Sequence, residues 1–383
     1  MEMKTRIALV DIFAKLRLSF VRSLSRLMLG PIAGNVPTSI IRSVAERMSD
    51  KQISQHVDDI IKIYPASIAA YEFPPEYPLS FRRTKVFEER HIYLLRDVIV
   101  SPRSGMVWLA GDKILEESIG SLRRIIGWGS NLSEAMQRPM PTLGEGRYVV
   151  AGSVGFFHWL FEVLPNLVQT SRRYCDVTFI VWRDSPSYIL ESIALLLGVQ
   201  NVGERVLLLD GPAKVKSLIM PQIDPFSGFV NQVDVDSIRT LVQADKMPSQ
   251  KIKRMIYVSR TRTSRRKLSN ELALQSELEK LGLEIVYAES LTLEEQIQTF
   301  RSARIVVGPH GAGLSNLVWS DNNCSVFEIF PFSVFNDCYA RLATSCGMAY
   351  DYVDCEKETG SSGRIPIDRV IPGVRRLLLR TID

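Results

Sequence analysis

Cysteine is scarce in this sequence, and the few cysteines present form no pattern that would build a framework. The five residues, Cys175, Cys324, Cys338, Cys346 and Cys355, are odd in number and include no C-x-x-C pair. This spacing argues against a disulfide framework and against a structural zinc site. No cleavable signal is evident at the start of the sequence, so we expect a reducing, cytoplasmic setting.

The sequence also lacks a hydrophobic run long enough to cross a bilayer. The best segment, residues 3–29, is interrupted by charges, although Leu9, Phe13, Leu16 and Phe20 recur with a helical period. A basic amphipathic helix of this kind can lie peripherally on the inner face of an anionic membrane. It can equally pack on its own protein or on a partner, and both interpretations stay open for residues 1–30.

Charge of one sign dominates only weakly, with 47 lysines and arginines against 42 acidic residues and a net charge of +5. This excess suits an anionic small ligand and argues against a nucleic-acid partner. There is also no Asp-x-Asp beside an expected strand, and we interpret Asp234-Val-Asp236 as a helix cap. We therefore expect no metal and no other cofactor.

The 383 residues are enough for two domains. We expect an N-terminal α/β domain over 31–248, with a helix at 38–63 and strands from 91–100 to 215–220. The polar residues 239–254 mark the boundary. In 249–383 apolar strands alternate with helices, which predicts a parallel sheet covered on both faces.

A glycine loop in this second domain is the most informative feature of the chain. The expected strand 304–307 runs directly into Gly308, Gly311 and Gly313, with His310 at the apex of the loop and a helix start behind it. Glycine allows close approach of a ligand to the backbone, and a helix start favours phosphate. The loop predicts a diphosphate site at the carboxyl edge of the sheet.

A basic segment precedes this loop by about 45 residues. Eight lysines and arginines lie between Lys251 and Lys267, including Arg260, Arg265 and Arg266, with no acidic residue among them. Arginine pairs well with phosphate oxygens, so two or three of these side chains are expected to bind the ligand. The alternatives are a solvated loop or a nucleic-acid patch.

Two further positions are candidates for chemistry. His158 and Glu162 are four residues apart, so on a helix they share a face, and a carboxylate beside an imidazole makes a suitable general base. The alternative is a buried couple in a helix core. Glu328 ends the expected strand 325–329, where an acid can bind ribose hydroxyls or simply lie on the surface.

Together these segments resemble glycosyltransferase family 61, whose bacterial members are often named capsular polysaccharide biosynthesis proteins. The resemblance covers about residues 90–355. Its motifs are Phe157-His158-Trp159-Leu160 with Glu162 and Pro165, Ser259-Arg260 with Arg265-Arg266 and Asn270-Glu271, and Gly308-Pro309-His310-Gly311-Ala312-Gly313-Leu314 with Asn316 and then Glu328.

The resemblance implies a GT-B-like α/β architecture, with two Rossmann-like domains facing a central cleft. It implies an inverting, metal-independent glycosyltransferase that moves a sugar from a nucleotide donor, UDP in most members. The acceptor would be a hydroxyl of a surface polysaccharide or lipid-linked glycan. His158 or Glu162 would be the catalytic base, and the donor ligands would be Arg260, Arg265, Arg266, Asn270, His310, Gly311, Ala312, Gly313, Asn316 and Glu328. The alternative is a non-catalytic scaffold protein with a decayed transferase fold.

Overall fold

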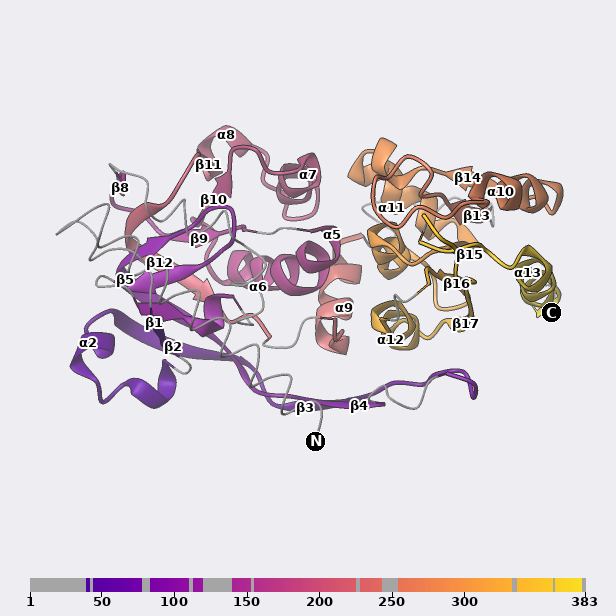
Figure 1. Ribbon diagram of the computed structural model, residues 1–383. Coiled ribbons are helices and arrows are strands. Elements are labelled where there is room, and N and C mark those ends of the chain that lie inside the picture. The colour runs from indigo at the N-terminus through magenta and orange to yellow at the C-terminus, as the bar shows by residue number, and fades with distance from the viewer. Residues whose placement is uncertain are drawn as a thin grey trace. The chain divides into compact units, whose positions relative to one another are not determined.

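The computed structural model describes residues 39–41, 44–77, 83–109, 113–119, 140–152, 155–224, 228–242, 254–332, 336–360 and 362–380 (Figure 1). The expected amphipathic helix at 3–29 lies outside these residues. The chain divides into two compact units, the first with the bounds Met1–Ser67 and Phe87–Ser227, the second with the bounds Ile68–Val86 and Gly228–Asp383. No helix among the described residues is long and apolar enough to cross a membrane.

The first unit is built on a ten-stranded sheet in the order β1-β7-β6-β5-β12-β9-β10-β11, with β2 paired to β5 and β8 to β12. Its strands are β1 (Ser39–Ile41), β2 (Val57–Tyr64), β5 (Arg90–Val100), β6 (Val107–Leu109), β7 (Lys113–Leu115), β8 (Thr142–Leu143), β9 (Tyr148–Val150), β10 (Thr178–Trp182), β11 (Val206–Leu209) and β12 (Ala213–Pro221). Its helices are η2 (Ala45–Arg47), α2 (Lys51–Ser54), η3 (Glu116–Ser118), α5 (Phe156–His158), η4 (Trp159–Val163), α6 (Leu164–Arg173), α7 (Ser187–Leu195) and α8 (Val202–Arg205).

This sheet is mixed rather than uniformly parallel. Strands β12, β9, β10 and β11 run parallel, with helices in the β9–β10 and β10–β11 connections, as a Rossmann-like unit would have. Strands β2, β5, β6, β7 and β12 instead meet as antiparallel pairs. The α/β class is confirmed, but only part of the first unit has the Rossmann-like pattern that the resemblance implies.

The helix expected at 38–63 is wrong. This segment forms β1, two short helical turns and then β2, which pairs antiparallel with β5. Residues Val57, Ile60, Ile61 and Ile63 are β-branched, and such side chains favour a half-buried strand when a partner strand is present. The helical spacing of apolar residues was therefore overridden by pairing with a strand about 30 residues further along the chain.

The second unit holds a five-stranded parallel sheet in the order β14-β13-β15-β16-β17. Its strands are β13 (Arg254–Val258), β14 (Glu284–Val286), β15 (Ala303–Pro309), β16 (Ser325–Phe330) and β17 (Ala349–Asp354). Its helices are α9 (Gln232–Arg239), η5 (Thr240–Val242), α10 (Glu271–Lys280), η6 (Ala288–Ser290), α11 (Leu293–Arg301), η7 (Ala312–Trp319), α12 (Cys338–Ser345) and α13 (Ile367–Arg380).

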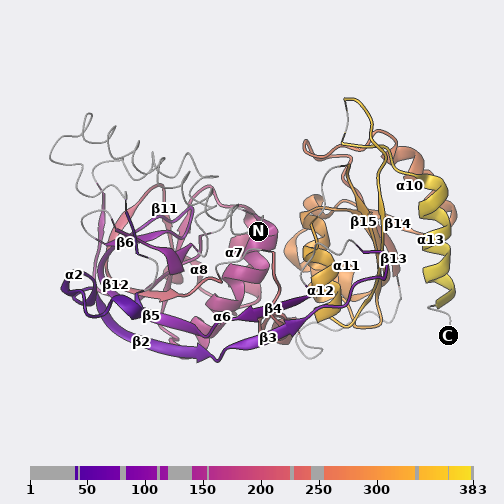
Figure 2. The same cartoon turned by 60° about the horizontal axis from the view of Figure 1, so that its bottom comes forward.

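Taken in chain order, these strands have the doubly wound sequence 2-1-3-4-5. Figure 2 shows α10 and α13 along one face of the sheet and α11 and α12 along the other. A buried cluster joins the first pair of helices to the strands, with Leu274, Leu278 and Val374 packed among Ile305 and Val307. The parallel, doubly covered sheet expected for the C-terminal half is thus confirmed.

The second unit also takes in a segment from early in the chain, Ile68–Val86, which we call the strap. It carries most of the two-stranded sheet of β3 (Ser67–Ala70) and β4 (Thr84–Phe87). The unit further includes residues 228–242, whereas the boundary predicted from the sequence, 248–249, falls within residues the structure does not describe. Residues 228–242 include α9, an amphipathic helix whose Val235 and Ile238 are buried.

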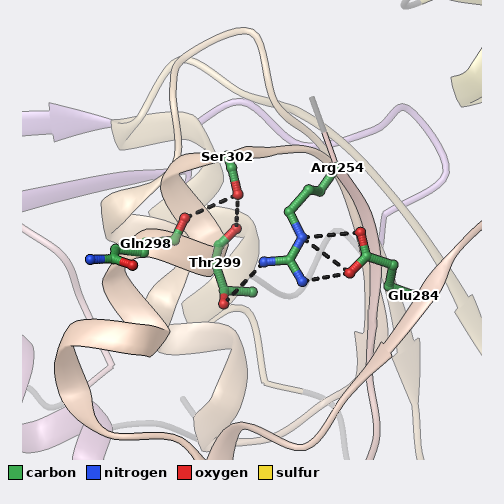
Figure 3. A network of polar contacts seen from close by, with 5 residues as sticks. All are labelled: Arg254, Glu284, Gln298, Thr299 and Ser302. Atoms are coloured by element: carbon green, nitrogen blue, oxygen red, sulfur yellow. Dashed lines mark hydrogen bonds and ion pairs between the residues drawn. The ribbon is translucent and has the colours of Figure 1, made fainter. Parts of the chain in front are cut away.

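A polar cluster fastens the amino ends of β13 and β14 (Figure 3). The Arg254 guanidinium donates to both carboxylate oxygens of Glu284, with Nε–Oε1 at 3.0 Å and Nε–Oε2 at 3.1 Å, and Nη1 donates to Thr299 Oγ1 at 3.3 Å. Ser302 Oγ donates to the carbonyls of Gln298 and Thr299, which ends α11. Arg254, one of the eight basic residues of the expected phosphate-binding segment, is therefore engaged at the opposite end of the strand.

Candidate functional site

The candidate site lies where the strand order of the second unit reverses. Strands β13 and β15 are neighbours, and the connection that leaves the carboxyl end of β13 leads to β14 on one side, whereas the connection that leaves β15 leads to β16 on the other. In doubly wound sheets a ligand binds in the crevice outside the carboxyl ends of the strands at such a point. The Ser259-Arg260 segment directly follows β13, and the His310 loop directly follows β15.

Arg260 and Gly311 are in direct contact at this point. A Cβ built on Gly311 would lie 1.9 Å from Nη1 and 2.8 Å from Cζ of Arg260, so the guanidinium occupies the space that any other residue would need. Gly311 has φ 179°, an extended conformation open to every residue, so it is the position of the Arg260 side chain, and not the backbone, that favours glycine here. The two segments that the sequence predicted to share a phosphate are thus in contact.

Gly313 is needed for a different reason. A Cβ there would lie 2.9 Å from Cγ1 of Val258, which would push the loop away from β13. The loop continues at Ala312 into η7, so the helix start expected behind the loop is confirmed. The helix is of the 3₁₀ type, which winds more tightly than an α-helix.

The Arg260 segment is held by a buried carboxylate. Glu271, only 2% exposed, accepts hydrogen bonds from the Tyr257 hydroxyl at 3.2 Å, the Ser259 hydroxyl at 3.1 Å and the Arg260 backbone amide at 2.7 Å. Gln275 donates to the same Ser259 hydroxyl at 2.9 Å. These contacts fix the turn that leaves β13, so Glu271 positions Arg260, a function the sequence analysis did not assign.

The Arg260 guanidinium is partly buried and lies close to a second positive charge, that of Arg266. It donates to the carbonyl of Arg265 at 3.0 Å, and burial together with the nearby charge of Arg266 lowers the pKa of Arg260. Arg266 has φ 57°, a left-handed conformation that a non-glycine residue rarely adopts. Its side chain is half-buried, whereas that of Arg265 is exposed. Two close cations held in a strained turn would gain from an anion between or beside them.

His310 is buried and held by Glu328. The imidazole Nδ1 lies 2.5 Å from Oε1 of Glu328, and the ring stacks on Phe330 at 5.4 Å between centroids. Tyr350 donates its hydroxyl to the other oxygen, Oε2, also at 2.5 Å. Glu328 itself is 0% exposed. The function of Tyr350 could not be predicted from the sequence, because nothing in the residues of β17 distinguishes it from Tyr352.

Two asparagines named as candidate ligands are engaged by the protein. Asn316 is 0% exposed, donates to Gln296 Oε1 at 2.8 Å and accepts from the Trp319 indole at 3.1 Å, which ties η7 to α11. Asn270 exchanges two hydrogen bonds with the backbone of Ile365, at 2.9 and 2.8 Å. The structure thus gathers Arg260, Gly311 and their neighbours at the switch point, with the two asparagines fastened to other elements.

In the first unit, His158 and Glu162 pair as their spacing predicts. His158 Nδ1 lies 2.8 Å from Glu162 Oε1, with the histidine side chain 35% exposed and that of Glu162 only 5%. The pair spans the junction of α5 and η4, and η4 is a π-helix. Single π-helical turns within helices occur often at functional sites, because they re-aim side chains.

A small cavity borders this pair within the first unit. It has a volume of about 30 Å³, and its lining includes Gly105, Gly152, Glu162 and Asn166. That space is enough for one or two water molecules. The Oδ1 atom of Asn166 is buried and has no hydrogen-bond partner among the described residues, so it offers such a water an acceptor. Among those same residues, no group of three or more His, Cys, Asp or Glu could hold a metal ion.

Comparison with known proteins supports the resemblance noted from the motifs. Over 108 residues the chain is 38% identical to the EGF domain-specific O-linked N-acetylglucosamine transferase of Drosophila melanogaster, an alignment that covers 27% of this chain. The chain spans only 20% of the length of that relative. The family model described as Glycosyltransferase 61 matches residues 156–327, which include the His158 segment, the Arg260 segment and the His310 loop. The chain therefore carries a glycosyltransferase 61 domain over residues 156–327.

Proposed function

We propose that this protein is an inverting glycosyltransferase that uses a nucleotide sugar, and that the second unit binds the donor through its diphosphate. One observation carries the proposal: the Arg260 guanidinium lies against Gly311, at the switch point of a parallel sheet. The glycosyltransferase 61 domain supports the same class of reaction. We also propose, from the family resemblance, a GT-B-like architecture in which the first unit is the acceptor-side domain and the second unit is the donor-side domain.

The diphosphate would be neutralised by arginine rather than by a metal ion. Arg260 and Arg266 are close enough for one charge to lower the pKa of the other, and a bound anion would relieve that repulsion. Guanidinium forks pair with phosphate oxygens through two hydrogen bonds at once. We therefore propose a metal-independent donor site, to which Arg265 and the loop Gly311–Gly313 would contribute further contacts.

The chemical step would be a single displacement. The acceptor hydroxyl attacks the anomeric carbon while the bond from that carbon to the phosphate oxygen breaks, and the nucleoside diphosphate leaves with the electron pair. The hydroxyl proton passes to His158 or to Glu162. With Glu162 ionised and bound to Nδ1, the His158 ring keeps Nε2 as a proton acceptor, which favours His158 as the base and Glu162 as the group that orients it.

The substrates are proposed from the family and the relative. UDP is the expected nucleotide, and N-acetylglucosamine is the first sugar to test, because the relative is named as a transferase of that sugar. The expected acceptor is a hydroxyl of a surface polysaccharide or lipid-linked glycan. Such an acceptor implies a cytoplasmic reaction, at or near the inner membrane face, where the basic segment 3–29 would add affinity for anionic lipid.

A thermal-shift measurement with UDP, GDP, CDP, ADP and CMP, each with EDTA and with magnesium, tests the proposal. We expect stabilisation by UDP that survives EDTA and is lost in Arg260→Ala. Arg262→Ala is the matched control, because Arg262 packs on Tyr287 at 3.7 Å and donates to Ser290. Release of UDP from UDP-N-acetylglucosamine by the wild-type protein would then show turnover.

Two results would contradict the proposal in different ways. Stabilisation that requires magnesium would contradict the metal-independent site. No response to any of the five nucleotides, in a folded protein, would favour the alternative of a non-catalytic scaffold with a decayed transferase fold.

A further inference from the structure

The Glu328 carboxylate is fully enclosed, and each of its oxygens has a partner within the second unit. Oε1 lies 2.5 Å from His310 Nδ1 and Oε2 lies 2.5 Å from the Tyr350 hydroxyl, while the residue is 0% exposed. A ribose hydroxyl would have to displace one of these groups to reach Glu328. The geometry suits a carboxylate that acts on its protein neighbours better than one that binds the ligand directly.

Tyr350 is in turn covered by the strap. The ring of Tyr77 meets that of Tyr350 edge-on, with centroids 6.1 Å apart and an interplanar angle of 72°. Tyr77 also stacks on Phe73 at 4.8 Å and is 2% exposed. Among the described residues, three hydrogen bonds anchor the strap to the rest of the unit. They run from the Tyr71 hydroxyl to the Val230 carbonyl at 2.8 Å, from the Thr344 hydroxyl to the Glu72 carbonyl at 2.7 Å and from the Tyr352 hydroxyl to the Glu76 carbonyl at 3.0 Å.

We infer that Tyr350 is a positioning residue for His310 and acts through Glu328. The strap holds Tyr350 in place through the Tyr77 ring that packs against it. The inference rests on the proposed function in one respect, that His310 faces the donor. It concerns residues on both sides of the matched segment 156–327, since Tyr77, Glu328 and Tyr350 all lie outside it.

The physical basis is the two-sided clamp on the carboxylate. A carboxylate on Nδ1 fixes which imidazole nitrogen holds the proton and leaves Nε2 as the nitrogen available to a ligand. The Tyr350 hydroxyl prevents rotation of the carboxylate and satisfies an oxygen that would otherwise be buried without a donor. Burial, together with the charge of Glu328, raises the pKa of Tyr350 well above its usual value, so this hydroxyl keeps its proton.

The surroundings contain other charged groups that bear on the same site. Asp337 pairs with Arg341, and burial raises the pKa of Asp337 to about 6. Arg341 packs over the Phe229 ring at 3.7 Å, which keeps the guanidinium beside its carboxylate. Because this neighbouring pair has its own partners, a change at Tyr350 is expected to act on Glu328 and His310 first.

The test compares Tyr350→Phe with Tyr352→Phe in the full chain. Both remove one hydroxyl from β17, and both keep the ring, but the Tyr352 hydroxyl donates to the carbonyl of Glu76 at 3.0 Å and not to Glu328. The readout is the proton NMR signal of the imidazole Nδ1–H, which lies far downfield when a carboxylate accepts it, assigned by its loss in His310→Gln. UDP affinity is measured in parallel by calorimetry.

In Tyr350→Phe the carboxylate loses its second donor and becomes a stronger acceptor for His310, so we expect the signal to move further downfield. UDP affinity should fall about tenfold, the usual effect of removing an outer partner of a ligand-binding side chain. Tyr352→Phe removes one of the three anchors of the strap but neither partner of Glu328, so it should change both readouts much less than Tyr350→Phe does. Glu328→Gln, which preserves the shape of the side chain, should move the signal upfield and serves if Tyr350→Phe does not fold.

The two readouts separate this inference from the proposed function. If the His310 signal shifts in Tyr350→Phe but the protein binds no UDP, the positioning of His310 by Tyr350 through Glu328 is supported and the choice of donor is overturned. If the signal is unchanged in Tyr350→Phe, or changes equally in Tyr352→Phe, the positioning function of Tyr350 is overturned whatever the UDP affinity.

Discussion

Replacing Gly311 by alanine should weaken donor binding without weakening the fold. The new methyl group would lie 1.9 Å from Nη1 of Arg260, so the guanidinium must move. Alanine adds no backbone strain, because φ at this position is 179°, an extended conformation that any residue adopts. The clash is with the end of a flexible side chain, which can turn away at little cost, and alanine also reduces the conformational freedom of the unfolded chain.

The magnitude follows from the contacts that the displaced guanidinium would no longer make. Hydrogen bonds to a charged group contribute about 1.5 to 3 kcal/mol each, and a guanidinium that has turned away loses at least one of them. UDP affinity should therefore fall by roughly tenfold to a hundredfold. The free energy of unfolding in the absence of nucleotide should stay within about 0.5 kcal/mol of the wild-type value.

Calorimetric titration of UDP and urea denaturation of the free protein measure the two effects. Gly313→Ala is the matched control, because its methyl group would lie 2.9 Å from Cγ1 of Val258 and so press on packed structure. That variant should lose about 1 to 3 kcal/mol of stability, the usual cost of overpacking. The two glycines, two residues apart, are thus expected to affect different properties.

The double variant Arg260→Ala/Gly311→Ala decides the mechanism. If the methyl group acts only through the guanidinium, it should have no further effect once Arg260 is gone. An additional loss of affinity in the double variant would mean that the methyl group blocks the ligand itself. Wild-type UDP affinity in Gly311→Ala alone would refute the reasoning, because the guanidinium would then be irrelevant to the donor.

Three further predictions concern other parts of the chain. Burial raises the pKa of Glu117 to about 7 from 4.5, so its contribution to stability is complete below pH 4.5 and is lost as the pH rises through 7. The free energy of unfolding should fall by about 3 kcal/mol across that window relative to Glu117→Gln, as measured by urea denaturation of both proteins. His158→Ala should reduce the rate of sugar transfer by a factor of about 10² to 10⁴ while UDP affinity is unchanged, and wild-type turnover would reject it as the base. Arg254→Ala should cost about 1 kcal/mol by removing the Glu284 pair and leave UDP affinity intact; a loss of affinity would place Arg254 in the site after all.

The second unit was largely predictable because its elements are defined by local patterns. The strand expected at 325–329 is β16 at Ser325–Phe330, and the expected alternation with helices includes α11 at Leu293–Arg301, which begins with a capping box at Thr292. Short apolar strands and capped helices carry their signal within a few residues. The contact between Arg260 and the His310 loop followed from the rule that parallel strands end at one edge.

The features that were missed depend on distant partners. The region 38–63 has apolar residues at a spacing that also suits a helix, but pairing with distant strands makes its two ends strands, β1 beside β7 and β2 beside β5. Tyr350 and Tyr352 look alike in sequence, yet one hydroxyl binds Glu328 and the other the backbone of residue 76. The partners of Asn270 and Asn316 were equally invisible, because an asparagine near a glycine loop suits a ligand and a structural tie alike.

The strap also sets an order of events during synthesis. The hydrogen bond between Tyr352 and Glu76 joins residues 276 positions apart, so one partner leaves the ribosome long before the other. At about 5 to 20 residues per second, the interval is roughly 15 to 55 s. During this interval Tyr77 and Phe73 lack Phe330, Ala340 and Tyr350, the later residues with which they pack in the folded unit. These exposed aromatic side chains are the ones that a chaperone would need to shield. Expression of residues 228–383 alone would omit the strap and so leave Tyr350 uncovered.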